Sequence, residues 1–177
     1  MLDTLITSKT RLKLLLKFFL NSNATSYLRQ LESEFGESSN AIRLELNRFE
    51  QSGLLTTKTT GYKKFYRANT KHPLFQDINT ILHKYIGFDK IVENVINKLG
   101  DVEYVHVVGD FARGMDNQII DLIFVGKNID REYLARLVEK SEKLIKRKIR
   151  YVTFGRQEFK NYIASQKEEE ILLLWKK

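Results

Sequence analysis

The stretch that most constrains this 177-residue sequence is 105–126. A valine-rich run at 105–108 and an apolar run at 119–125 flank a middle segment that contains Gly109 and Gly114. Short apolar runs bounded by turn residues are typical of buried strands. Glycine between them marks backbone that must bend sharply or approach another group closely. The stretch therefore predicts a strand, a glycine turn leading into a short helix, and a second strand.

The residues of this turn resemble the signature of the nucleotidyltransferase superfamily, a Gly-Ser-x-Ala-Arg-Gly turn followed by a strand with Asp-x-Asp. The matching residues here are Gly109, Asp110, Phe111, Ala112, Arg113 and Gly114 in the turn, and Asp121 in the strand. The resemblance implies that Gly109, Asp110, Arg113 and Gly114 would cradle nucleotide phosphates. It also implies a magnesium site made by both strand aspartates and a third carboxylate on a later strand.

Three departures from this signature argue against transferase chemistry. Asp110 replaces the serine, and an ionised carboxylate cannot donate a hydrogen bond to phosphate and repels it. Ile119 stands where the first aspartate belongs, so only Asp121 remains. The later strand, near 148–154, carries Lys148 and Arg150 but no acid. Magnesium bound with nucleotide needs carboxylate ligands. We therefore expect the fold without a metal site and without enzymatic activity, leaving Asp121 as a vestigial candidate.

A purely structural alternative remains open for the same residues. In that interpretation Asp121 is a strand-end carboxylate that hydrogen-bonds the glycine turn, and Arg113 is its salt-bridge partner.

Residues 1–70 predict three short helices and a hairpin. Leu12, Leu15, Leu16 and Phe19 have the i, i+3, i+4, i+7 spacing of a helix that Ser8 can cap. The three helices are expected over about 8–20, from Ala24 to Gly36, and from Ser38 or Ser39 to Ser52-Gly53; a hairpin is expected around Thr60-Gly61. This order resembles the winged helix-turn-helix domains of ArsR- and MarR-like bacterial transcriptional regulators.

The resemblance implies that the third helix reads the major groove of double-stranded DNA. With Ile42, Leu46 and Phe49 inward, its outward residues are Ser39, Asn40, Arg43 and Asn47. Arginine suits guanine and asparagine suits adenine in that groove. The expected phosphate contacts from the wing are Lys58, Thr60, Tyr62, Lys63 and Lys64. The alternative is an ordinary solvated helix face with Glu45 and Glu50 as ion partners, and the wing aromatics are expected to serve packing.

Charge and composition agree with a nucleic-acid partner. The formal net charge is +8, and residues 1–75 hold 12 Lys and Arg against 6 Asp and Glu. The excess positive charge therefore lies in the winged-helix half. Cysteine is absent, which excludes disulfides and thiolate metal sites. The sequence has neither a signal-peptide pattern nor an apolar run long enough to cross a membrane, so we expect a cytoplasmic protein with no membrane partner.

The remaining sequence predicts a helical connector and a small sheet domain. The connector is expected over 71–100, and Pro73 within it starts the next helical element. The domain over 101–177 adds a helix at 130–146, a strand at 149–154 and a short helix at 157–165. The basic run 143–148 is expected as a solvated helix end, and the acidic run 168–170 is expected in solvent. The run Ile171–Trp175 is too apolar for solvent, so we expect it to dock on the core or on a partner subunit.

Together these features predict an α+β protein: an N-terminal winged helix-turn-helix over 1–70, then a small nucleotidyltransferase-like α/β domain with a mixed sheet. The expected function is a DNA-binding transcriptional regulator that acts as a homodimer and needs no cofactor. Its second domain would serve dimerisation or the sensing of a small-molecule or protein partner. Two alternatives stay open. One is an active magnesium-dependent nucleotidyltransferase, and the other is an antitoxin-like protein-interaction module.

Overall fold

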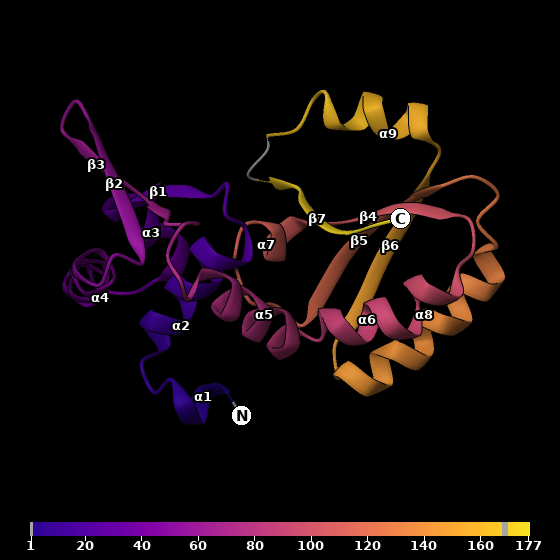
Figure 1. Ribbon diagram of the computed structural model, residues 1–177, viewed down its shortest axis with the longest axis horizontal. Coiled ribbons are helices and arrows are strands. Elements are labelled where there is room, and N and C mark those ends of the chain that lie inside the picture. The colour runs from indigo at the N-terminus through magenta and orange to yellow at the C-terminus, as the bar shows by residue number, and fades with distance from the viewer. Residues whose placement is uncertain (1, 168–169) are drawn as a thin grey trace. The chain divides into compact units, whose positions relative to one another are not determined.

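The computed structural model describes residues 2–167 and 170–177 of an α+β chain (Figure 1). The chain divides into two compact units between Leu82 and His83, a boundary within helix α5 (Phe75–Ile86). Residues 71–82 of the expected connector therefore belong to the first unit, and residues 83–100 belong to the second.

The first unit combines helices with a three-stranded antiparallel sheet of order β1-β3-β2. Besides the start of α5, its elements are α1 (Leu2–Leu5), α2 (Lys9–Leu15), the π-helical turn η1 (Leu16–Leu20), β1 (Thr25–Tyr27), α3 (Leu28–Phe35), α4 (Ser39–Gln51), β2 (Leu55–Thr60) and β3 (Lys63–Ala68). The succession of helix, strand, two helices and a hairpin is the order of elements in a winged helix. The α+β class predicted for the chain is therefore observed, and the element order of this half is consistent with a winged helix.

Local capping chemistry sets the predicted helix ends. The hydroxyl of Ser8 accepts a hydrogen bond from the backbone N–H of Arg11, and Ser38 does the same for Ala41. Gly36 ends α3 in the left-handed conformation, with φ of 63°. Gly61 has φ of 59° as the first of two residues between β2 and β3. Glycine at that position suits a two-residue hairpin turn, so the predicted hairpin is confirmed.

The helix predicted to start at Ala24 is wrong in its first residues. Thr25–Tyr27 form strand β1, which pairs with β3, and α3 begins only at Leu28. The backbone of Tyr27 is extended, with φ of −125° and ψ of 163°. Its ring packs edge-on against Phe65, with 5.4 Å between the ring centres. Pairing with β3 supplies these backbone groups with partners from a distant segment, which helical spacing cannot reveal.

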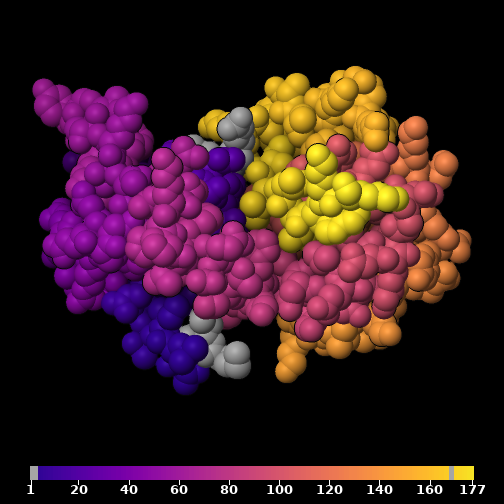
Figure 2. All heavy atoms as spheres, in the orientation of Figure 1, coloured from indigo at the N-terminus to yellow at the C-terminus, as the bar shows by residue number. Residues whose placement is uncertain are grey.

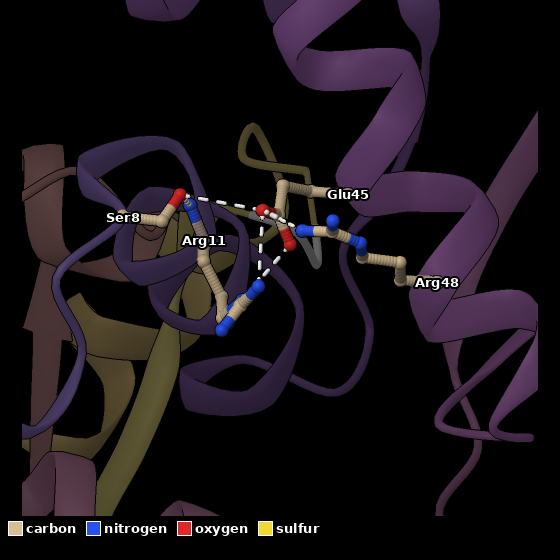
Figure 3. A network of polar contacts seen from close by, with 4 residues as sticks. All are labelled: Ser8, Arg11, Glu45 and Arg48. Carbon is tan, nitrogen blue, oxygen red and sulfur yellow. Dashed lines mark hydrogen bonds and ion pairs between the residues drawn. The ribbon is translucent and has the colours of Figure 1, made fainter.

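Glu45 ties α4 to the N-terminal part of the first unit (Figure 3). Its carboxylate accepts hydrogen bonds from Arg11 at 2.9 and 3.1 Å and from Arg48 at 2.9 Å, and Ser8 Oγ lies 3.4 Å away. Burial acts to raise the pKa of Glu45, but the hydrogen bonds and charges of Arg11 and Arg48 outweigh burial and lower it. The carboxylate is therefore ionised at neutral pH and links α2 to α4.

The second unit is built on a four-stranded mixed sheet of order β6-β5-β4-β7, in which only β5 and β6 run parallel. After the end of α5 its elements are α6 (Phe88–Asn94), the 3-10 turn η2 (Ile96–Lys98), β4 (Val102–Val108), α7 (Gly109–Ala112), β5 (Ile119–Gly126), α8 (Arg131–Ile145), β6 (Lys148–Phe154), α9 (Arg156–Ile163) and β7 (Leu172–Lys176). Helices α6 and α8 lie on one face of the sheet and α9 on the other (Figure 1).

The central strand β5 packs against helices through alternate side chains. Ile123 and Val125 form an apolar cluster with Phe159 of α9. Leu122 and Phe124 point to the opposite face, because successive side chains of a strand alternate. Both sets are buried, as expected for a strand that is covered on both faces.

The C-terminal apolar run docks on the core as predicted. Four of its residues, Leu172 to Trp175, lie in the edge strand β7, which pairs with β4 (Val105 with Trp175, Val107 with Leu172) and lies at the surface of the unit in yellow (Figure 2). Glu168 and Glu169 of the predicted acidic run lie outside the described residues. In the described part of the chain, no helix is both long enough and apolar enough to cross a membrane.

Candidate functional site

A groove of about 570 Å³ lies between α4 and the β2–β3 hairpin, whose tip projects from the unit (Figure 2). It is lined by Tyr27, Leu28, Arg29, Arg43, Leu46, Asn47, Tyr62, Lys63, Lys64 and Tyr66. Five of the predicted DNA contacts are therefore brought together: Arg43 and Asn47 from α4, and Tyr62, Lys63 and Lys64 from the hairpin. Ser39, Asn40, Lys58 and Thr60 do not line the groove.

The outward face of α4 presents side chains that are free to bind. Asn40, Arg43 and Asn47 are exposed and Ser39 is half-buried. Their spacing places them on one side of the helix. Among the described residues, Arg43 and Asn47 make no side-chain hydrogen bond or ion pair. In the predicted alternative, Glu45 and Glu50 would be the ion partners of this face. Glu45 instead pairs with Arg11 and Arg48, and Glu50 pairs with Lys64.

Glu50 holds the hairpin against α4. Its carboxylate accepts hydrogen bonds from Thr57 Oγ1 at 3.1 Å and from Lys64 Nζ at 2.6 Å. The bond from Lys64 is the main cause that lowers the pKa of Glu50, and it correspondingly raises the pKa of Lys64. The two neighbouring lysines therefore differ: Lys64 is neutralised within the protein, whereas Lys63 lies over the ring of Tyr27 at 4.5 Å.

The wing aromatics divide between packing and exposure. Tyr66 is buried, and Phe65 packs on Tyr27 as described above, so the packing role predicted for these two residues is confirmed. Tyr62 is fully exposed at the hairpin turn, so the packing role predicted for this residue is wrong. A turn residue after Gly61 has no neighbouring strand to cover it.

Sequence reasoning did not include Tyr27, Leu28 and Arg29 among the groove residues. These residues reach the groove because β1 aligns with β3 and α3 starts directly after it. The available signal was the cation Arg29 in the first turn of α3, where the helix dipole disfavours positive charge.

The glycine turn of the second unit forms an internally paired cluster. Asp110 accepts hydrogen bonds from Asn117 at 2.6 Å and from Arg113 at 2.9 Å. The bond from Asn117, helped by Arg113, lowers the pKa of Asp110, so this carboxylate stays ionised. An anionic side chain at this position opposes phosphate binding in the turn.

Asp121 lies beside this turn and pairs with Arg150. The guanidinium donates from Nε to Oδ1 at 2.7 Å and from Nη2 to Oδ2 at 2.9 Å, because residues 121 and 150 are register partners on the parallel strands β5 and β6. The predicted Asp121–Arg113 salt bridge is therefore wrong; Arg113 pairs with Asp110 instead. The sequence indicates Arg150 only as a basic residue of a strand that carries no carboxylate, and strand register is what brings it to Asp121.

Arg147 closes the loop between the turn and β5. It donates to Asp116 at 2.7 Å and to the carbonyl of Asn117, and its guanidinium lies 5.3 Å from the centre of the Phe111 ring. Its side chain is only 11% exposed. The prediction of a solvated basic run at 143–148 is therefore wrong for Arg147.

The residues present do not fit the magnesium ion that the transferase signature implies. Asp121 is held by a guanidinium, Ile119 offers no oxygen, and the nearest carboxylate of the turn is bound by Arg113 and Asn117. Across the described residues, no group of three or more histidine or acidic side chains is arranged to hold a metal. The guanidinium of Arg150 supplies a positive charge beside Asp121, at the place where the signature would have a magnesium ion.

Comparisons with known proteins give distant structural likenesses only. No family model and no curated protein matches the chain. Reduced HlyU from Vibrio cholerae is 20% identical, with a TM-score of 0.37 over 47% of this chain and 82% of that chain. A predicted DNA-binding transcriptional regulator from E. coli is 19% identical, with a TM-score of 0.35 over 47% and 80%. A candidate nucleotidyltransferase from Sulfolobus solfataricus is 23% identical, with a TM-score of 0.38 over 56% and 86%. These likenesses are too weak to transfer a function.

Proposed function

We propose that the first unit binds double-stranded DNA, with α4 as the recognition helix in the major groove and the β2–β3 hairpin as a wing on the phosphate backbone. The supporting observation is the cationic groove between these two elements. Arg29, Arg43 and Lys63 line it, and none of them forms an ion pair with another described residue.

The distribution of ion pairs in the first unit strengthens this proposal. Four of its glutamates, Glu34, Glu37, Glu45 and Glu50, are each bound by a lysine or arginine. Of those cations only Lys64 lines the groove. Most of these carboxylates therefore neutralise cations elsewhere in the unit, whereas Arg29, Arg43 and Lys63 at the groove keep their charge unpaired among the described residues. A concentrated positive surface attracts the phosphate backbone.

On this proposal the protein is a cytoplasmic transcriptional regulator that acts as a homodimer. A DNA operator with two-fold symmetry is bound by a protein dimer with the same symmetry. The second unit serves dimerisation or ligand sensing on a transferase-like framework. The Arg150–Asp121 pair argues against nucleotide transfer there, since it occupies the remaining carboxylate.

The decisive experiment measures binding of the protein to duplex DNA from around its own gene and to random duplex, at two salt concentrations. We expect site-selective binding that weakens steeply with salt, because bound lysines and arginines displace counterions. Arg43→Ala should cost about 1–3 kcal/mol on the selected site and little on random DNA if Arg43 reads a base. Equal losses on both would make Arg43 a phosphate contact.

A matched control comes from Lys9, an exposed cation outside the groove. Lys9→Ala removes the same charge as Arg43→Ala, so it should leave site selection unchanged. Absence of any DNA binding at low salt would refute the proposal and favour the groove as a protein-docking surface.

A further inference from the structure

The second unit has a separate cavity of about 500 Å³ on the α9 side of its sheet. It is lined by Tyr104 and His106 of β4, Val125 of β5, Arg156, Phe159 and Lys160 of α9, and Leu173 and Lys176 of β7. All eight residues belong to one unit, and none belongs to the glycine turn. A volume of this size is within the range of small-molecule sites, about 300–1,000 Å³.

The floor of the cavity is aromatic and apolar. The centre of the His106 ring lies 4.5 Å from the centre of the Phe159 ring and 6.3 Å from the centre of the Tyr104 ring. Val125 is buried beside them, whereas Leu173 is half exposed at the edge. Offset packing against such rings favours a flat aromatic body over a flexible chain.

The rim of the cavity is cationic. Arg156 is paired with Glu103, which is outside the lining. Lys176 lies 5.8 Å from the centre of the Tyr104 ring, and neither Lys176 nor Lys160 forms an ion pair with another described residue. No described residue that lines the cavity is a carboxylate. An anionic group on a ligand would therefore meet positive charge and no fixed negative charge within the lining.

His106 is a polar group in this floor that the fold leaves unsatisfied. Its Nδ1 is buried and has no hydrogen-bond partner among the described residues. Burial lowers the pKa of His106 to about 4, so the ring is neutral at neutral pH and anion recognition falls to the basic rim. Buried polar groups without partners are uncommon and call for an explanation such as a functional role.

We infer that this cavity binds a small aromatic anion, with the ring over Tyr104, His106 and Phe159 and the charged group toward Lys160 and Lys176. This site is independent of DNA binding by the first unit, so either proposal can fail without the other.

The test uses the full chain and two dyes with the same aromatic skeleton. 1-Anilinonaphthalene-8-sulfonate carries a sulfonate, and N-phenyl-1-naphthylamine lacks it. We expect saturable binding of the anionic dye, and Lys160→Glu should weaken it about fivefold or more. Binding of the neutral dye should change little. Lys140→Glu, at an exposed lysine of α8 outside the cavity, makes the same change in charge and should have no effect.

Changes in backbone amide chemical shifts on addition of the anionic dye then locate its binding site. Shifts concentrated in β4, α9 and β7 support the proposal. Shifts concentrated at the cationic groove of the first unit, equal losses from Lys160→Glu and Lys140→Glu, or equal affinity for both dyes would each overturn it.

Discussion

Arg150 and Asp121 form a two-point ion pair across the parallel strands β5 and β6, at 2.7 and 2.9 Å. Their positions are adjacent in the strand register, so the guanidinium directly faces the only carboxylate that the transferase signature retains. Bidentate geometry makes such a pair directional as well as electrostatic. The second unit therefore has a protein cation beside the one carboxylate that matches the nucleotidyltransferase signature in the sequence.

Restoring a divalent-cation site should require removal of this guanidinium. Ile119→Asp supplies a second carboxylate on the same face of β5, two residues from Asp121, but leaves Arg150 in place. Adding Arg150→Asp supplies a third carboxylate and removes the positive charge. We expect calorimetric titration with Mn²⁺ to show binding for the double variant only, because divalent cations need several oxygen ligands. Equal binding by Ile119→Asp alone would show that Arg150 does not exclude the ion.

The two lysines of the wing should contribute unequally to DNA binding. Lys63→Ala should reduce the salt dependence of binding by about one unit of slope, the effect of one lost phosphate contact. Lys64→Ala should reduce it by less, because Glu50 already neutralises Lys64 at 2.6 Å. The measurement is the slope of log affinity against log salt for each variant. A larger loss from Lys64→Ala would mean that DNA displaces Glu50.

Sequence reasoning located most elements because their signals are local. The spacing of Leu12, Leu15, Leu16 and Phe19 and the cap at Ser8 specify a helix from neighbouring residues. The strands at 102–108 and 119–126 were similarly marked by apolar runs and glycines. These features depend on contacts within a few residues.

The errors concern partners that only the folded chain brings together. Tyr27 joins a strand because of Phe65, and Asp121 meets Arg150 rather than Arg113 because β5 and β6 are parallel neighbours. The same limit applies to the cavity under α9, since its lining comes from four separate elements. Strand register and helix packing decide such pairs, and no short sequence pattern encodes them.

The Glu45 network predicts a loss of stability at acidic pH. The folded pKa of Glu45 lies below its ordinary value of 4.5, so its stabilising effect is complete above pH 4.5 and disappears as pH falls through the folded pKa. Glu45→Gln should destabilise the first unit by about 1–2 kcal/mol at neutral pH, less than a fully buried pair because Arg11 and Arg48 are partly exposed. The difference from wild type should shrink on acidification.

Hydrogen exchange of the α4 amides measures this effect within the first unit. Glu32→Gln is the matched control, since Glu32 forms no ion pair among the described residues and should change stability by at most about 0.5 kcal/mol. A Glu45→Gln difference that is independent of pH would contradict an electrostatic role.

Gly109 is predicted to be required by the fold of the second unit itself. It has φ of +67°, and a Cβ there would lie 2.7 Å from Asp121 Oδ2. Gly109→Ala should therefore cost about 1–3 kcal/mol in the free energy of unfolding, from backbone strain and from the clash. Urea unfolding followed by the fluorescence of Trp175, the single tryptophan, reports on this unit. Gly100→Ala is the control, because Gly100 has no positive φ and no atom within 4 Å of the added Cβ.

A second variant separates the two causes of the Gly109 effect. Asp121→Ala removes the clashing oxygen, so Gly109→Ala should cost less in that background, and the remaining cost measures the backbone strain. The loss of the exposed Arg150 partner adds little, because Arg150 is 69% exposed. If the cost is the same in both backgrounds, the clash with Asp121 is relieved by a small movement and backbone strain alone fixes glycine. If the cost falls, the glycine serves the approach of Asp121, so its presence in the turn is explained without a bound phosphate.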